Sequence, residues 1–180
     1  MLFPANYDVR VLEELPNLRV RRLFFPGARE DGGQNGVNVL VSPNEGEPWI
    51  GTFASGGFGL GFEGVFSCPN PFTLCVVSRG PAYLVDVQRP EAHTIFDHIT
   101  DLRCSVNHQL LLFAELTEVF AYGVAGFVWK TTGLGLDDVH LTSLTEDTLS
   151  GTCWDLRSDD DCSFEIDLKT GSHTGGAFEP

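Results

Sequence analysis

Glycine and proline recur along the whole chain and divide it into short segments. The 180 residues include 20 Gly and 10 Pro, which leaves few windows long enough for a helix of ordinary length. Short strands joined by turns are therefore expected to dominate. Because 180 residues fall within the size of one domain, residues 1–180 are expected to fold as a single all-β domain.

Composition supports a packed core and disfavours two classes of partner. Hydrophobic residues make up 42% of the chain and include 14 Phe and 3 Trp, so there is ample apolar surface to bury. The formal net charge of -14 disfavours binding to nucleic acid and to anionic membranes. The longest apolar run, around 110–114, is far shorter than the ~20 residues of a membrane-spanning helix.

The start of the chain and the cysteines indicate a reducing compartment. The first residues show neither the basic region nor the apolar region of a secretory signal, so a cytoplasmic location is expected, provided that no leader has been removed. The cysteines are odd in number and have no CxxC spacing, which indicates reduced and mostly buried thiols. They are Cys68, Cys75, Cys104, Cys153 and Cys162. Cys68, beside Pro69, is expected to be the most exposed of them.

From residue 74 onward a strand-turn-strand pattern recurs about every forty residues. Aromatic-containing strands are expected at 83–87, 119–122 and 164–168, and an apolar strand precedes each of them, at 74–77, 110–114 and 149–154. An outer strand such as 139–142 completes a unit. Three or four short antiparallel strands at this period are typical of a propeller blade.

The first half of the chain is less regular. Residues 36–73 are expected to form a degenerate unit that contains a hairpin, and residues 1–35 an N-terminal arm of short strands, with a short helix at 9–15 as an alternative. Residues 74–180 form the blade-like repeats. At about forty residues per unit the chain accommodates four units, either as a closed ring, as an open stack or as half of a dimer.

Two segments resemble repeats of a known kind. The sequences VFAYGVAGFVWKT and FEIDLKTG are similar to the strand-turn-strand core of β-propeller repeats, in particular the quinoprotein-like type. The resemblance covers about residues 74–176 and implies small repeated antiparallel sheets. It implies no cofactor, because a cofactor-binding propeller of that family needs more blades than this chain can supply.

No residue pattern identifies a catalytic or metal site. The histidines form no HxH or HxxxH pair, so no metal site is expected. They are His93, His98, His108, His140 and His173. The nucleophile motif Gly-x-Ser-x-Gly is absent from the sequence, and no base can be assigned to Cys68.

Two further motifs are interpreted as structural. Asp159, Asp160 and Asp161 resemble a calcium loop but lack the glycine and the distal glutamate of an EF-hand, so they are expected to form a solvated acidic turn. Glycines 59, 61 and 64 match GxGxxG, yet Pro69 and Pro71 follow where that motif requires a helix. No dinucleotide site is expected.

The leading hypothesis is a non-enzymatic protein-interaction module without cofactor or metal. Residues 131–180 contain eleven acids against Arg157 and Lys169, which favours a basic protein as the partner. The expected contact residues lie in the Gly-rich loop and the acidic turn, namely Phe53, Phe58, Phe62, Asp159, Asp160 and Asp161. A narrower hypothesis is an immunity-type inhibitor of a basic toxin or nuclease.

Two alternatives remain open at this point. A hydrolase would assemble its site across blades from His93, His98, His140, Asp86 and Asp167 beneath a concave pocket. A structural subunit of a larger propeller would form a homodimer by pairing its strand edges.

Overall fold

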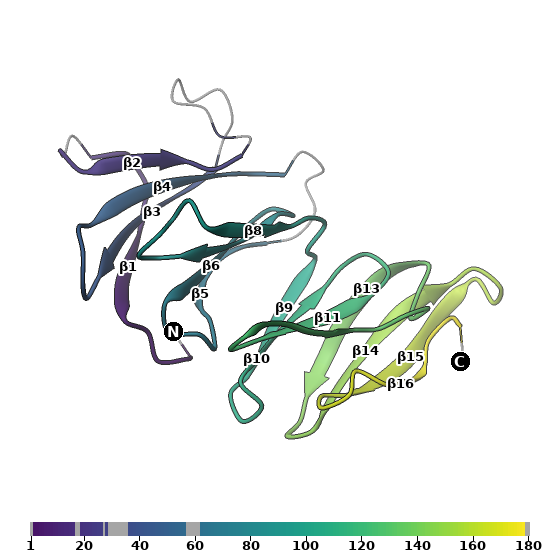
Figure 1. The fold of residues 1–180 in the computed structure, drawn as a ribbon. Coiled ribbons are helices and arrows are strands. Elements are labelled where there is room, and N and C mark those ends of the chain that lie inside the picture. The colour runs from purple at the N-terminus through teal and green to yellow at the C-terminus, as the bar shows by residue number, and fades with distance from the viewer. Residues whose placement is uncertain (1, 17–18, 27, 29–35, 57–61, 179–180) are drawn as a thin grey trace. The chain divides into compact units, whose positions relative to one another are not determined.

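The chain folds into four small sheets. The computed structural model describes residues 2–16, 19–26, 28, 36–56 and 62–178, which form sixteen strands and no helix. Each sheet has four strands, and we label the sheets A to D in chain order (Figure 1). The predicted all-β class with small, propeller-like repeated sheets is confirmed. The described part of the chain has no helix with the length and apolar content needed to cross a membrane.

The chain divides into two compact units, residues 1–97 and 98–180, where one domain was expected. The first unit contains sheet A, with spatial order β1-β3-β4-β2, and sheet B, with order β5-β6-β7-β8. Sheet A consists of β1 (Tyr7–Leu12), β2 (Arg21–Phe24), β3 (Gly36–Pro43) and β4 (Trp49–Ala54). Sheet B consists of β5 (Glu63–Ser67), β6 (Thr73–Ser78), β7 (Ala82–Asp86) and β8 (His93–Phe96).

The second unit contains sheets C and D, and in both of them the strands follow one another in chain order as antiparallel neighbours. Sheet C consists of β9 (Asp101–Ser105), β10 (Leu110–Ala114), β11 (Val119–Gly123) and β12 (Gly126–Lys130). Sheet D consists of β13 (Asp137–Leu144), β14 (Thr148–Asp155), β15 (Asp160–Asp167) and β16 (His173–Gly175).

The N-terminal segment does not form a separate arm. It supplies both outer strands of sheet A: β1 pairs antiparallel with β3, and β2 pairs parallel with β4. The helix considered at 9–15 is wrong, because Tyr7 and Val9 alternate onto one face of β1 and pack into the apolar core of the first unit. Strand β5, expected in the degenerate unit of 36–73, belongs to sheet B.

Each unit has an apolar core built from the facing sides of its two sheets. In the first unit, Val39 and Val41 of sheet A pack with Leu74 and Val76 of sheet B. In the second unit, residues of β10, β11 and β12 pack with residues of β13, β14 and β15. The core residues of a strand are two positions apart, because successive side chains of a strand point to opposite faces. This alternation determines which face of each sheet is turned toward the core.

The predicted repeat is present. Tyr83, Tyr122 and Phe164 lie on β7, β11 and β15, the third strand of sheets B, C and D. These strands begin at residues 82, 119 and 160, which are 37 and 41 residues apart. The period of about forty residues is therefore one four-stranded sheet.

Each unit also uses one tryptophan to join its two sheets. Trp49 Nε1 donates to the carbonyl of Val87 at 3.0 Å, and Trp129 Nε1 donates to the carbonyl of Leu168 at 2.9 Å. Both acceptors directly follow the third strand of the next sheet. The donors are 80 residues apart and the acceptors 81, so the two units repeat the same intersheet contact.

Candidate functional site

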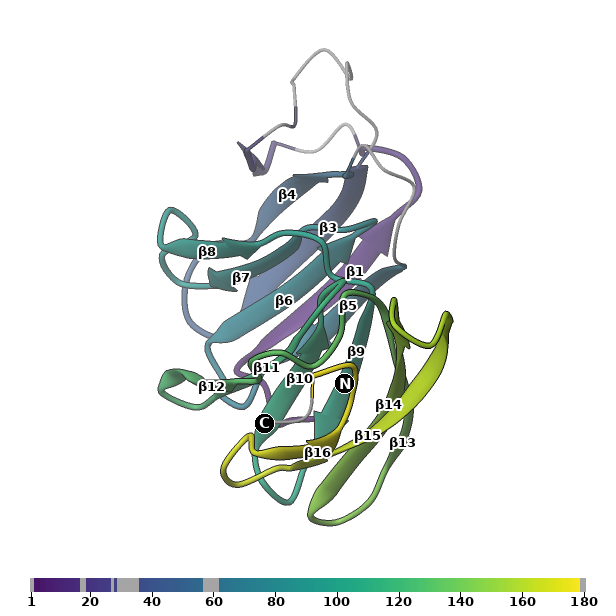
Figure 2. The same ribbon diagram turned by 90° about the vertical axis from the view of Figure 1, so that its right-hand side faces the viewer.

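Sheet D turns one polar face away from the core of the second unit, and we call it the polar face. Strands β13, β14 and β15 lie side by side (Figure 2). Leu149, Cys153 and Phe164 are buried on the core side, so the residues that alternate with them point the other way. We define the polar face by three cross-strand rows, Asp137-Trp154-Asp161, His140-Thr152-Ser163 and Ser143-Ser150-Glu165-Thr174. The next row on the same side, Thr148-Asp167, is left out because the Asp167 carboxylate caps the following turn.

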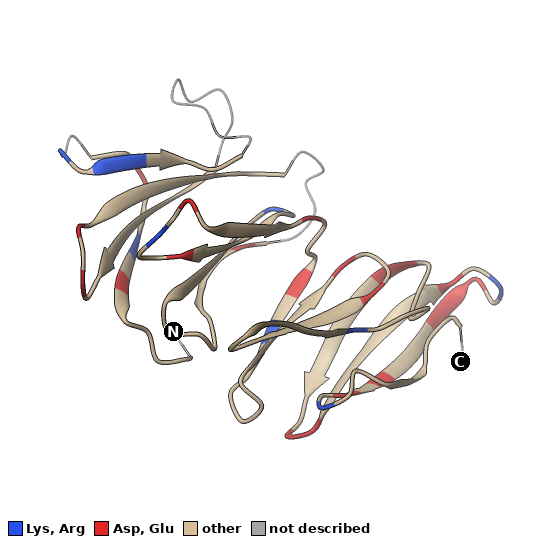
Figure 3. Cartoon of the chain, in the orientation of Figure 1, with Lys and Arg blue, Asp and Glu red and all other residues tan. Residues whose placement is uncertain are grey.

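The polar face has three carboxylates and no lysine or arginine. Residues 98–180 contain fourteen Asp and Glu against four Lys and Arg, and Figure 3 shows acidic segments on the strands of sheet D. The four cations have other contacts: Arg103 with Asp101, Lys130 with Glu115 and Glu118, Lys169 with Asp147, and Arg157 with the ring of Phe178. Among the described residues, no ion pair reaches Asp137, Asp161 or Glu165.

Trp154 is the aromatic residue of the polar face. It is half-buried on β14 and lies in register between Asp137 of β13 and Asp161 of β15. An aromatic ring between two carboxylates suits a cationic side chain. The face of the ring attracts the cation, and the two carboxylates attract it through their opposite charge. Trp154 was not among the residues predicted to bind, and its position between two acids becomes visible only once the register is known.

The aromatic residues predicted to bind do not form a surface site. Phe53 is fully buried, where its ring stacks on Phe25 at 4.2 Å and meets Tyr83 edge-on. Phe53 is therefore a core residue, which corrects the prediction. Phe62 is half-buried and packs edge-on against Phe66, and Phe58 lies outside the described residues.

The acidic turn is solvated, as predicted. Asp155 caps the turn between β14 and β15, because its carboxylate accepts hydrogen bonds from the Arg157 amide and the Ser158 hydroxyl. These bonds lower the pKa of Asp155, the Arg157 amide contributing most. Asp159 adopts the left-handed conformation, with φ of 55°, and Asp160 and Asp161 open β15 in exposed positions. Of Asp159, Asp160 and Asp161, only Asp161 lies on the polar face.

The residues proposed for a hydrolase have separate structural contacts. Asp86 and Asp167 cap equivalent turns after the third strands, where each carboxylate accepts two backbone amides. His140 pairs with Asp138 at 2.9 Å, with both side chains more than half exposed. His93 lies edge-on to Phe25.

Two further groups that an enzyme could use are buried. Cys68, expected to be the most exposed thiol, is fully buried. His173 Nε2 is buried without a hydrogen-bond partner among the described residues, so no carboxylate orients it as a base. The described residues contain no group of three or more His, Cys, Asp or Glu side chains able to hold a metal ion.

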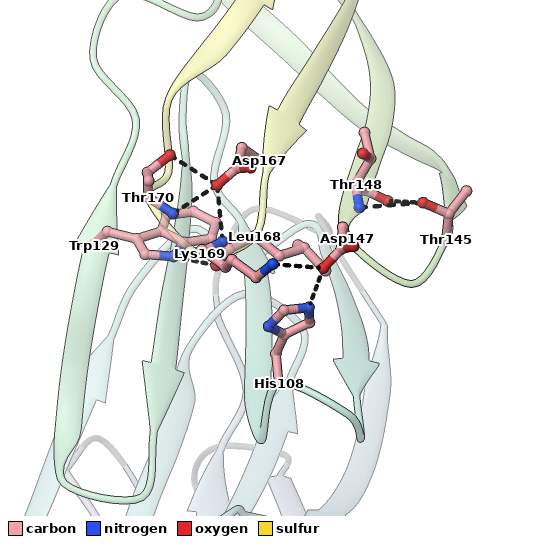
Figure 4. A network of polar contacts seen from close by, with 9 residues as sticks. All are labelled: His108, Trp129, Thr145, Asp147, Thr148, Asp167, Leu168, Lys169 and Thr170. Carbon is pink, nitrogen blue, oxygen red and sulfur yellow. Dashed lines mark hydrogen bonds and ion pairs between the residues drawn. The ribbon is translucent and has the colours of Figure 1, made fainter.

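A polar network links the turns of sheets C and D (Figure 4). Asp147 Oδ1 lies 2.9 Å from His108 Nε2 and 3.3 Å from Lys169 Nζ, and the Asp147 carbonyl accepts the Leu168 amide at 2.9 Å. The network lies beside the bond from Trp129 to Leu168. The hydrogen bond from Lys169, followed by the bond from His108, lowers the pKa of Asp147.

Replacing Lys169 with methionine should raise the pKa of Asp147 toward its ordinary value. A carboxyl whose pKa is lowered on folding contributes stability above its unfolded pKa, and the contribution is lost as the pH falls through the folded pKa. NMR titration of the Asp147 carboxyl carbon checks the change, with Lys130→Met as a control that leaves Asp147 untouched. An unchanged Asp147 pKa in Lys169→Met would exclude Lys169 as the main cause.

A second exposed surface lies on the hairpin of β11 and β12. Val124, Phe127 and Val128 are 46%, 58% and 49% exposed. Phe127 is the last ring of a stack with Phe120 and Phe113, whose successive ring centroids lie 6.4 and 4.9 Å apart. This apolar hairpin was not predicted to be a surface feature, since its alternation is also that of a buried strand.

The solved structures to which the chain is similar include two that share little sequence identity with it. The chain matches no family model and no curated protein. It is similar to the N-terminal domain of Nup159, with 14% identity and a TM-score of 0.45 over 99% of this chain and 51% of that chain. A chain in the S. cerevisiae assembly of a Dbp5 variant bound to Nup159, a Gle1 variant, IP6 and ADP gives 12% identity and a TM-score of 0.43, over 98% and 52%. This chain thus spans about half the length of both.

Proposed function

We propose that the chain is a protein-binding module whose polar face receives a basic surface of another protein. The observation that carries the proposal is the row Asp137-Trp154-Asp161, together with Glu165, on a sheet face whose carboxylates have no cation among the described residues. A partner rich in lysine or arginine would supply the missing charge.

Electrostatics favours a basic partner over a neutral one. The second unit has ten more acids than bases, from fourteen against four, which is most of the chain's net charge of -14. A field of one sign raises the rate of encounter with the opposite charge and repels partners of like charge. The partner's cations would meet exposed carboxylates at the rim and Trp154 between them, so affinity is expected to centre on the aromatic residue.

The chemistry of the face also favours a polar protein surface over another apolar sheet. Ser150, Thr152 and Ser163 present hydroxyl groups that both donate and accept hydrogen bonds. A tight sheet-on-sheet interface would instead need apolar side chains at these positions. The polar face is therefore suited to reversible recognition, and Trp154 is the one large apolar side chain that it offers to a homodimer.

Charge reversal on the polar face tests the proposal. With poly-L-lysine as a defined probe, the double variant Asp161→Lys/Glu165→Lys should bind at least ~10-fold more weakly than the unmodified chain, because two attractive contacts become repulsive. Isothermal titration calorimetry at fixed ionic strength measures the change. Trp154→Ala should also weaken binding, without any change in net charge.

The matched control is Glu45→Lys/Glu47→Lys, which makes the same change in net charge on the exposed turn between β3 and β4. It should weaken binding less than the polar-face variant does. Equal losses in the two variants would mean that only total charge matters and would contradict a defined site. In affinity capture from a cell extract, a specific partner should be retained by the control and lost by the polar-face variant.

The hypothesis of an immunity-type inhibitor is one case of this proposal. It adds a requirement, since binding of the basic partner must abolish that partner's activity. An inhibition assay with the captured protein would distinguish an inhibitor from a module that only recruits its partner.

A further inference from the structure

Cys153 and Cys162 form a pair of facing thiols inside sheet D. They lie directly opposite each other on β14 and β15, and their Sγ atoms are 3.4 Å apart. Directly opposed residues of antiparallel strands have Cα atoms about 4.5–5.5 Å apart, which lies within the range that a disulfide spans. Bond formation requires the sulfurs to approach by about 1.3 Å, to the usual length of about 2.05 Å, a movement that side-chain rotation can supply.

The thiols are reduced in the structure and differ in access. Cys162 is half-buried, whereas Cys153 is fully buried in the core of the second unit. Cys153 Sγ donates to the Leu134 carbonyl at 3.1 Å and Cys162 Sγ donates to the Cys153 carbonyl at 3.3 Å. Burial, followed by the hydrogen bond with Cys162, raises the pKa of Cys153 to about 12. The accessible partner is therefore the one that meets an oxidant first.

We propose that Cys153 and Cys162 are an oxidisable dithiol that closes to a cross-strand disulfide on reaction with a peroxide. The Cys162 sulfur attacks one peroxide oxygen, the O–O bond breaks, and water leaves as Cys162 becomes a sulfenic acid. The Cys153 sulfur then attacks the Cys162 sulfur, the S–O bond breaks, and the hydroxyl group leaves as a second water with the thiol proton. Two thiols and one hydrogen peroxide thus give one disulfide and two waters.

The bond would join the two strands that carry Trp154 and Asp161, the residues that follow Cys153 and precede Cys162. The inference rests on the facing thiols alone and does not depend on what the polar face binds. The other half-buried cysteine, Cys104 on β9, has no cysteine opposite it, since its partner in register is Leu111.

Peptide mapping tests the proposal directly, because Arg157 lies between the two cysteines. The folded chain is treated with hydrogen peroxide, its free thiols are alkylated, and it is digested with trypsin. Cleavage after Lys130, Arg157 and Lys169 places Cys153 in peptide 131–157 and Cys162 in peptide 158–169. We expect the two peptides to appear joined, with a mass about 2 Da below the sum of the reduced pair because two hydrogens are lost.

Variants assign the order of the steps. Cys153→Ser should leave Cys162 as a sulfenic acid that dimedone traps, and Cys104→Ser should leave the joined peptide unchanged. The proposal is overturned if unmodified protein shows Cys162 as sulfinic acid with Cys153 still alkylated, if Cys162 is joined to Cys104, or if both thiols stay reduced. These outcomes are read from the unmodified chain, so they do not depend on a variant folding.

Discussion

Replacing Trp129 with alanine should lower the free energy of unfolding by about 3–5 kcal/mol, the usual cost of removing a large buried aromatic side chain. Trp129 is 7% exposed, packs in the core of the second unit and donates to the Leu168 carbonyl. Trp49→Ala should have a similar cost in the first unit, because Trp49 is 3% exposed and makes the equivalent bond to Val87. Urea denaturation measures both changes, and hydrogen exchange locates them.

The third tryptophan is the control for this experiment. Trp154 is half-buried on the polar face and is not part of either core, so Trp154→Ala should cost about 1 kcal/mol or less. Trp129→Phe keeps most of the apolar contact but removes the donor, which should cost about 1–3 kcal/mol for the unpaired Leu168 carbonyl. If Trp154→Ala were as destabilising as Trp129→Ala, the intersheet role of Trp129 would be wrong.

Replacing Gly171 with alanine should cost about 2–4 kcal/mol. Gly171 has φ of 73°, and a Cβ added there would lie 2.7 Å from the Trp129 ring. Alanine at residue 171 would therefore lower stability in two ways, through backbone strain and through a clash with the Trp129 ring that joins the two sheets.

Gly133→Ala separates these two causes. Gly133 has φ of 70°, but the nearest atom to an added Cβ is Phe178 Cβ at 3.5 Å, an ordinary contact. Its cost should be limited to the backbone term of about 1–2 kcal/mol. Equal urea midpoints for the two variants would show that the Trp129 ring yields without cost.

Local sequence pattern was sufficient for most strands of the second unit, although β9 (Asp101–Ser105) was not predicted. Alternation in 164–168 and the apolar run at 110–114 predicted β15 and β10, because burial on one or both faces of a strand leaves a direct trace in the sequence. The acidic turn before Phe164 was also predicted, since Asp and Ser cap turns through their own side chains.

Contacts between distant segments left no such trace. Strand β2 pairs parallel with β4, and 28 residues separate the paired Arg21 and Trp49. No local pattern in the sequence distinguishes β2 from a loop. Phe53 has the residue type of a binding aromatic, but sheet packing buries it against Phe25. The bonds from Trp49 and Trp129 span 38 and 39 residues, so only the matched spacing of tryptophan and turn could have indicated them.

The polar face depends on strand register. Trp154 and Asp161 were each visible in the sequence, but a shift of one residue would move either of them to the core side. A turn centred between residues 157 and 158 would have paired Cys153 with Cys162 and Trp154 with Asp161, which is the register observed. The three aspartates instead predict a turn at 159–161, and a turn centred there does not pair these residues.

Amide chemical-shift mapping by NMR, during titration of the isotope-labelled chain with poly-L-lysine, tests the binding role of the polar face most directly. The account predicts that the shift changes concentrate at Thr152, Trp154, Asp161, Ser163 and Glu165, and that they diminish as salt is added. Changes concentrated on the hairpin of β11 and β12, or spread evenly over the acidic residues of both units, would contradict it.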